Sequence, residues 1–71
     1  MKIQFNTNIE LELIESLDAE GEVAESSLET FKAGDTLEVE EIESDEGRSQ
    51  FQTGDGSVFF IEDENFEVVE E

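Results

Sequence analysis

The sequence predicts an all-β protein, one small β-barrel domain of five to six short strands that spans residues 1–71. Three observations predict this class. Apolar residues recur at every second position in several segments, which is the period of a strand with one buried face. Turn sequences rich in Gly and Asp separate these segments. The 35% of hydrophobic residues, placed in this pattern, favours one folded core despite the high charge.

Two segments near the amino terminus, KIQF and NIELELIE, alternate apolar and polar residues. Because successive side chains of a strand point to opposite faces, each segment predicts a strand with a buried face. The second strand places Glu10 and Glu12 on its outer face.

The next segment predicts a long, irregular first hairpin with its tip at residues 18–22. Residues 22–31 return from this tip and are ambiguous. Ala24, Leu28 and Phe31 fall at i, i+4 and i+7, the spacing of a short amphipathic helix. We expect an irregular strand, because hairpin signals flank the segment, and keep the helix as the alternative.

A turn at residues 32–35 leads into a second strongly alternating segment, TLEVEEIE. Leu37 and Val39 face inward there, and Glu38 and Glu40 face outward. The alternation slips by one residue before Ile42, which predicts a β-bulge that bends the strand.

Two further turns organise the carboxyl-terminal half, one at residues 44–48 and one in the sequence GDGS. The second has Asp55 and Gly56 as central residues, a strong hairpin signal because both can take positive φ. It joins strands expected around residues 50–53 and 57–61. A single 3₁₀ turn at residues 63–66 and a last short strand complete the chain.

The strand SVFFI is apolar on both faces, so its orientation is the least determined. We expect Phe60 in the core. Phe59 and Ile61 then share the other face, which either the first hairpin covers or a partner meets. The predicted core consists of Ile3, Phe5, Ile9, Leu11, Leu13, Phe31, Leu37, Val39, Ile42, Phe51, Val58, Phe60, Phe66 and Val68.

The order of features from Phe31 to Val69 resembles that of SH3-like small barrels: a Gly-Asp turn, a long bent strand, a tight hairpin, a 3₁₀ turn and a closing strand. The FKAG turn and the GDGSV hairpin also resemble small acidic proteins of unknown function that bacteriophages and their bacterial hosts encode. The resemblance implies an SH3-like fold with a long irregular first hairpin. It implies no particular activity, because this fold hosts many functions, and the chain lacks the Trp and Tyr of a polyproline-binding groove.

Composition argues against catalysis and cofactors. The chain has no His and no Cys, which removes the usual general base and the thiolate nucleophile. The sequence TGDGS lacks the Lys and the following helix of a phosphate-binding loop. No segment fits a calcium loop, although residues 62–65 could hold a hard cation loosely. We therefore expect no enzyme, no cofactor and no metal site.

The net charge of −19 argues against direct binding to nucleic acids or to an anionic membrane. No apolar run is long enough for a signal peptide or a membrane-spanning helix. We expect a cytoplasmic protein, complete from Met1.

These features favour a small, non-enzymatic, acidic module that binds a protein partner. A basic protein would suit the acidic surface of the module. The alternative is an inhibitor that mimics nucleic acid, because outward glutamates on a strand repeat about every 6.6–6.8 Å. A solvated acidic surface that serves only solubility and a homodimer are also compatible with the sequence. The candidate partner-binding residues are Glu10, Glu12, Glu38, Glu40, Phe59 and Ile61.

Overall fold

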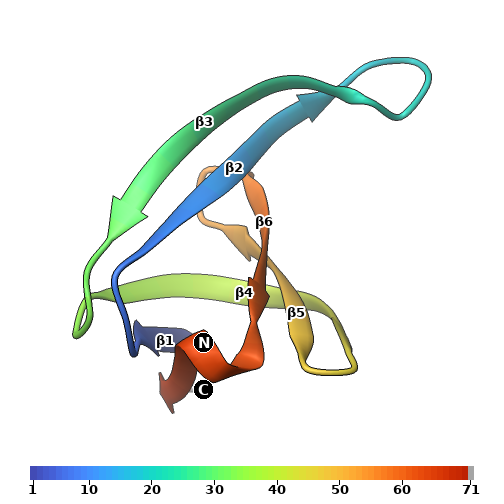
Figure 1. Cartoon of the computed structure of the whole chain (residues 1–71). Helices are drawn as coiled ribbons and strands as arrows, with labels where there is room; N and C mark the ends of the chain where they lie inside the picture. Colours follow the sequence, from blue (N-terminus) through green and yellow to red (C-terminus); the bar gives the residue numbers. More distant parts are fainter. Residues whose placement is uncertain (71) are drawn as a thin grey trace.

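Across residues 1–70, the part of the chain that the computed structural model describes, seven antiparallel strands and one 3₁₀ turn form the fold (Figure 1). The hydrogen-bonded order of the strands is β3-β2-β6-β5-β4-β1-β7. In chain order the elements are β1 (Lys2–Phe5), β2 (Ile9–Leu17), β3 (Val23–Phe31), β4 (Thr36–Asp45), β5 (Arg48–Thr53), β6 (Val58–Glu62), η1 (Asp63–Asn65) and β7 (Phe66–Glu70).

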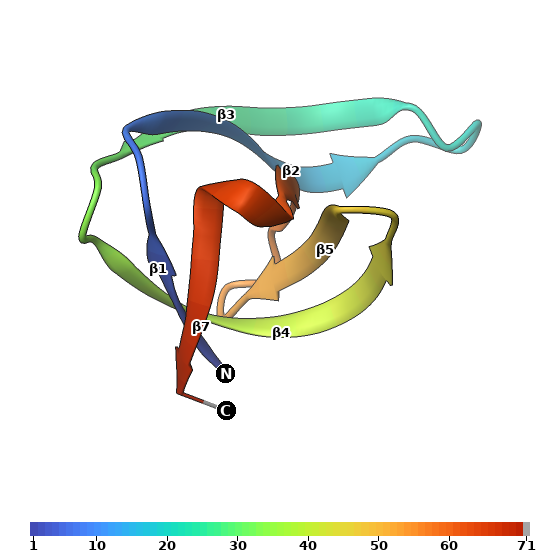
Figure 2. The ribbon, with the colours of Figure 1, turned by 60° about the horizontal axis from the view of Figure 1, so that its bottom comes forward.

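The sheet curls around the core but does not close (Figure 2). Within residues 1–70, β3 and β7 are the two edges, and β2 meets β6 through a single residue pair, Ile14 with Val58. The β2–β3 hairpin therefore arches over the end of β6 and extends past it (Figure 1). The all-β class is confirmed, whereas the prediction of a closed barrel with five to six strands was wrong.

Several local predictions are confirmed. The ambiguous residues 22–31 contain strand β3, which pairs with β2 from Ile9–Phe31 to Leu17–Val23. The bulge in β4 appears as a register shift between Glu41 and Glu43. The 3₁₀ turn lies at Asp63–Asn65, as the sequence predicts.

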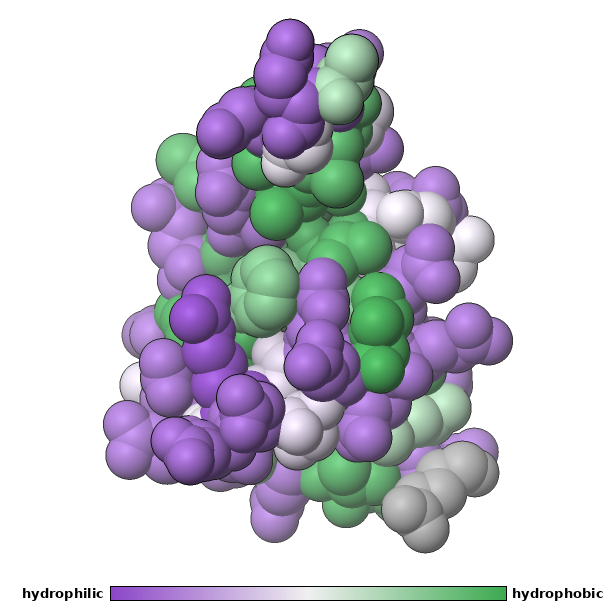
Figure 3. All heavy atoms as spheres, turned by 90° about the vertical axis from the view of Figure 1, so that its right-hand side faces the viewer, coloured by the Kyte–Doolittle hydropathy of each residue, from purple (hydrophilic) through white to green (hydrophobic). Residues whose placement is uncertain are grey.

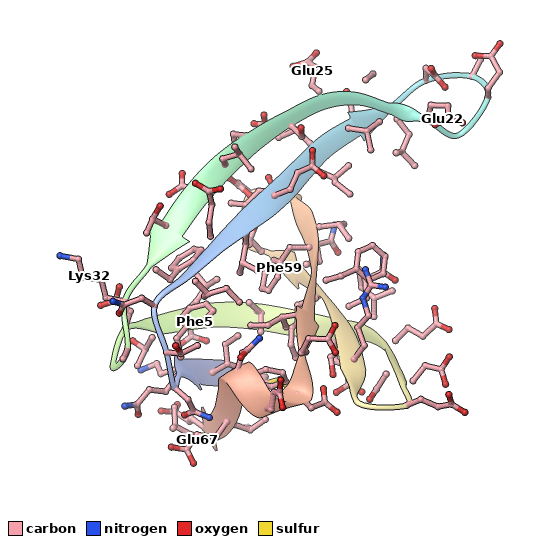
Figure 4. The ribbon with its side chains drawn as sticks, in the orientation of Figure 1. Phe5, Glu22, Glu25, Lys32, Phe59 and Glu67 are labelled. Carbon is pink, nitrogen blue, oxygen red and sulfur yellow. The ribbon has the colours of Figure 1, made fainter. Side chains whose placement is uncertain are left out.

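Phenylalanines dominate the core, and their rings pack against one another. Phe5 stacks on Phe31 with ring centroids 4.5 Å apart, and Phe51 meets Phe66 edge-on at 5.2 Å. Phe5 and Phe59 point into the space that the curved sheet encloses (Figure 4). Glu25, Lys32 and Glu67 point away from it (Figure 4). The buried apolar residues are Ile3, Phe5, Leu11, Val39, Phe51, Phe59, Ile61 and Phe66.

Most of the predicted core is confirmed, with specific exceptions. Ile9, Leu13, Phe31 and Leu37 are half-buried and pack against it, and Val58 is half-buried on the outer face. The prediction was wrong for Val58, which lies on the outer face, and for Ile42, Phe60 and Val68, which are exposed, and it missed Phe59 and Ile61.

The length of the β5–β6 loop explains why Phe59, and not Phe60, lies in the core. The Thr53 amide donates a hydrogen bond to the Ser57 carbonyl (2.8 Å), so the loop has three residues rather than two. Of these three, only Gly56 has a positive φ, 95°, as in a type I turn followed by a G1 bulge. This loop places Phe51 opposite Phe59, whereas a two-residue turn would place it opposite Phe60. A shift of one residue turns every side chain of the strand to the other face.

The two other exposed residues have local causes. Ile42 lies inside the β4 bulge, between the paired residues Glu41 and Glu43, and is itself not paired with a residue of β5. Val68 lies on the edge strand β7, where only Phe66 is buried. A bulge and an edge strand both remove a side chain from the regular inward alternation.

The β4–β5 turn contains one strained residue. Asp45 pairs with Arg48, so Glu46 and Gly47 form a two-residue turn, with φ values of 39° and 85°. Both positive values are typical of a type I′ turn, in which Asn-Gly is favoured. Glu46 is the non-glycine residue with positive φ among those described.

Phe59→Ala should unfold or strongly destabilise the protein, because a buried aromatic side chain contributes about 3–5 kcal/mol. Phe60→Ala should cost about 1 kcal/mol or less, because the side chain is 42% exposed. Thermal unfolding followed by circular dichroism measures both. Equal losses, or a larger loss at Phe60, would contradict the observed register.

Glu46→Asn should stabilise the protein by about 0.5–1 kcal/mol, because Asn tolerates positive φ better than Glu. Glu46→Gln is the matched control, since it removes the same charge and keeps the unfavourable backbone preference. Chemical denaturation of the three proteins would show whether Asn exceeds Gln. A Gln variant as stable as the Asn variant would mean that charge alone is responsible.

Candidate interaction surface

The predicted glutamate rows are exposed but do not meet. Glu10 and Glu12 lie on β2, and Glu38 and Glu40 lie on β4, with β6 and β5 between the two strands. Two of the four carboxylates have internal partners. Glu12 accepts a hydrogen bond from Ser26 Oγ (2.9 Å), and Glu38 lies 3.8 Å from Lys2 Nζ. The four residues therefore form two separate acidic strips.

Phe59 and Ile61, the two apolar candidates, are not available to a partner. Their exposed fractions are 0% and 3%, because the three-residue β5–β6 loop turns them into the core. This prediction was wrong. Phe60 takes their place on the outer face.

The outer face of β6, β5 and β4 changes from apolar to acidic across the sheet. Directly paired residues of neighbouring strands point to the same side, so each cross-strand row shares a face. Its β6 side is largely apolar, its β5 side polar and its β4 side acidic. The three rows are Val58–Gln52–Glu40, Phe60–Gln50–Glu43 and Glu62–Arg48–Asp45.

At the apolar side of this face lies a groove of about 560 Å³ between the β2–β3 hairpin and β6. We call it the apolar groove. Hydrophobic side chains extend from the β2–β3 hairpin onto this face, and hydrophilic side chains lie on both sides of them (Figure 3). Its volume falls in the range of small-molecule pockets. Its apolar lining residues are Ile14, Leu17, Val23, Val58 and Phe60.

Irregularity in β2 contributes two of these side chains. In a regular strand, Ile14 and Leu17 would point to opposite faces, because they are three positions apart. The β2–β3 register shifts between Ile14 and Ser16 and again between Ser16 and Leu17. These shifts allow both side chains to line the apolar groove, where Leu17 is 59% exposed.

Arg48 covers part of Phe60 at the centre of the face. Its guanidinium carbon lies 4.6 Å from the centre of the Phe60 ring, within the range of a cation–π interaction. Its cross-strand neighbours are Asp45 and Glu62. Within residues 1–70, however, the ion pairs closer than 4.0 Å both involve Lys2 and none involves Arg48.

Arg48 and Phe60 also border a second depression of about 180 Å³, which Glu43, Asp45 and Gln50 complete. It shares Gln50 and Phe60 with the apolar groove, so the two hollows adjoin. Sequence reasoning missed this arrangement because it placed Phe60 in the core. The correct hairpin register, with Gln50 opposite Phe60, would have revealed it.

The β5–β6 loop beside the groove is held by Asp55. The Asp55 carboxylate accepts hydrogen bonds from the Thr53 hydroxyl and from the Ser57 amide (3.1 Å). These bonds, that of Thr53 first, lower the pKa of Asp55 below its ordinary value of 3.8. The charged form of Asp55 therefore favours the three-residue loop.

Known proteins provide no assignment: the chain matches no protein-family model, no curated protein and no solved structure. Within residues 1–70 no three acidic side chains lie close enough together to hold a metal ion. The same residues contain no helix that is long and apolar enough to cross a membrane. The candidate site is therefore defined by the groove and the face beside it.

Asp55→Asn should lower the melting temperature near neutral pH, because it keeps an oxygen acceptor but loses the charge. The folded state lowers the pKa of Asp55, so its contribution is present above pH 3.8 and is lost as the pH falls further. The difference between the two proteins should thus shrink below that pH. Glu41→Gln, outside the loop, corrects for relief of general repulsion. A difference that is constant with pH would contradict a charge effect.

Proposed function

We propose that this protein is a non-enzymatic, SH3-like binding module that recognises a protein partner through the apolar groove. The order of its elements supports the SH3-like assignment. The turn at residues 32–35 packs against the end of β1, with hydrogen bonds from Gly34 N to Phe5 O (2.8 Å) and from Phe5 N to Asp35 O (2.9 Å). A 3₁₀ turn then leads into β7, which pairs with β1.

The observation that carries the proposal is the exposure of clustered hydrophobic side chains on a chain with net charge −19. Leu17, Val23 and Phe60 are between 42% and 59% exposed, and all three line one groove. Isolated exposed hydrophobic residues are common, but a contiguous set in a hollow is typical of an interaction site.

The lining of the groove also supports a binding role rather than catalysis. Among the reactions that carboxylates alone can catalyse, glycoside hydrolysis uses two of them on either side of the reacting bond. Glu15 is the one carboxylate among the residues that line the apolar groove.

A mimic of nucleic acid is the second candidate. The observation in its favour is the outer face of β4, where Glu38, Glu40, Glu43 and Asp45 are all exposed. Glu38 and Glu40 also border a separate hollow of about 430 Å³ beside Met1. A basic DNA-binding protein could bind such a strip in the way it binds the phosphates of DNA, with release of the counterions that surround the acidic groups.

Affinity capture from a lysate of the source cells distinguishes the two functions. For a groove-binding module, a double variant Leu17→Ser, Phe60→Ser should reduce recovery of the partner about tenfold or more, because anchor residues dominate interface energies. The matched double variant Glu38→Gln, Glu40→Gln should reduce it little. The reverse pattern, together with a steep loss between about 50 mM and about 500 mM NaCl, would support the mimic instead. Recovery that neither variant changes would contradict both.

A further inference from the structure

We propose that the outer face of β6, β5 and β4 binds an extended segment of the partner in one orientation. An apolar side chain of that segment enters the apolar groove, and a lysine or arginine about four residues away lies in the adjoining depression, between the Phe60 ring and the carboxylates of Glu43 and Asp45. Arg48 occupies the position of that cation in the free protein. This inference rests on the proposed function and specifies the chemistry of the partner.

The spacing follows from the cross-strand row Phe60–Gln50–Glu43. Neighbouring strands lie about 4.8 Å apart, so Phe60 and Glu43 are about 10 Å apart along the row. The apolar groove continues from Phe60 towards the β2–β3 hairpin, so the span from the groove to Glu43 is longer than this. Side chains four positions apart lie on the same side of an extended segment, about 13 Å from one another. The apolar groove at one end and Glu43 at the other therefore select a segment with an apolar and a basic side chain at that separation.

Arg48 indicates that a cation is favoured beside Phe60. Asp45 and Glu62 are its paired neighbours, yet its guanidinium lies over the Phe60 ring. The ring still has 42% of its surface exposed, so it can also contact a side chain from outside. A partner's guanidinium would compete with Arg48 for the ring, while Asp45 and Glu62 lie on either side of the displaced Arg48.

Charge excludes a second copy of the chain as the favoured occupant. Each copy has a net charge of −19, and pairing this face with itself would bring Glu40, Glu43 and Asp45 close to like charges. A basic segment instead gains from Glu43 and Asp45, and its association should be accelerated by electrostatic steering.

The probe is a fluorescein-labelled peptide with the sequence Leu-Leu-Gly-Gly-Arg-Arg, titrated with the full chain and followed by fluorescence anisotropy. Replacing either its leucines or its arginines by alanine should weaken binding about tenfold or more. Phe60→Leu should preserve binding of the leucines and abolish the preference for arginine over lysine, because it removes the ring that the guanidinium contacts. Circular dichroism verifies that each variant is folded.

Arg48→Gln should strengthen binding of the peptide about threefold or more, because it removes the internal competitor. Lys32→Gln is the matched control: it changes the net charge equally, and Lys32 points away from the core on the 32–35 turn (Figure 4). Equal effects of the two variants would overturn the role of Arg48. The inference would be overturned if the peptide with alanine in place of its leucines bound as tightly as the original peptide. It would also be overturned if the original peptide did not bind at all. Capture that depends on Leu17 and Phe60 would still support the proposed function in that case.

Discussion

The three-residue loop between β5 and β6 is the constraint on which the rest of the structure depends. The bond from Thr53 N to Ser57 O closes the loop, and Asp55 holds it through its carboxylate. The loop fixes the register of β6, and the register decides which face of β6 meets the core. Both the buried Phe59 and the exposed Phe60 are consequences of this one choice. The hydrophobic core and the apolar groove thus have a common origin.

Alternation and turn sequences together were sufficient to predict the all-β class and most of the strands. Where one face of a strand is acidic, as in β2 and β4, only one orientation buries the apolar residues, and Leu11 and Val39 are buried as expected. In SVFFI both faces are apolar, so alternation cannot choose between them. The choice then depends on whether the loop has two or three residues, and the sequence GDGS is compatible with both.

The candidate site was less predictable than the core for a related reason. The exposed glutamates could be identified because charged side chains rarely lie inside a small domain. The apolar groove combines Ile14 and Leu17 from an irregular part of β2 with Val58 and Phe60 from β6. Such a site arises from register shifts and from the tertiary meeting of two hairpins, which no local sequence pattern specifies.

The attachment of β2 to β6 through the single pair Ile14–Val58 has a mechanical consequence. Beyond this pair the β2–β3 hairpin projects towards its tip and carries Leu17 and Val23. Phe31 and Leu11 hold the other end of the same hairpin against the core, so bending of the hairpin would displace its tip most. Such bending would change the width of the apolar groove, which Leu17 and Val23 line, and would leave the register of the β5–β6 hairpin unchanged.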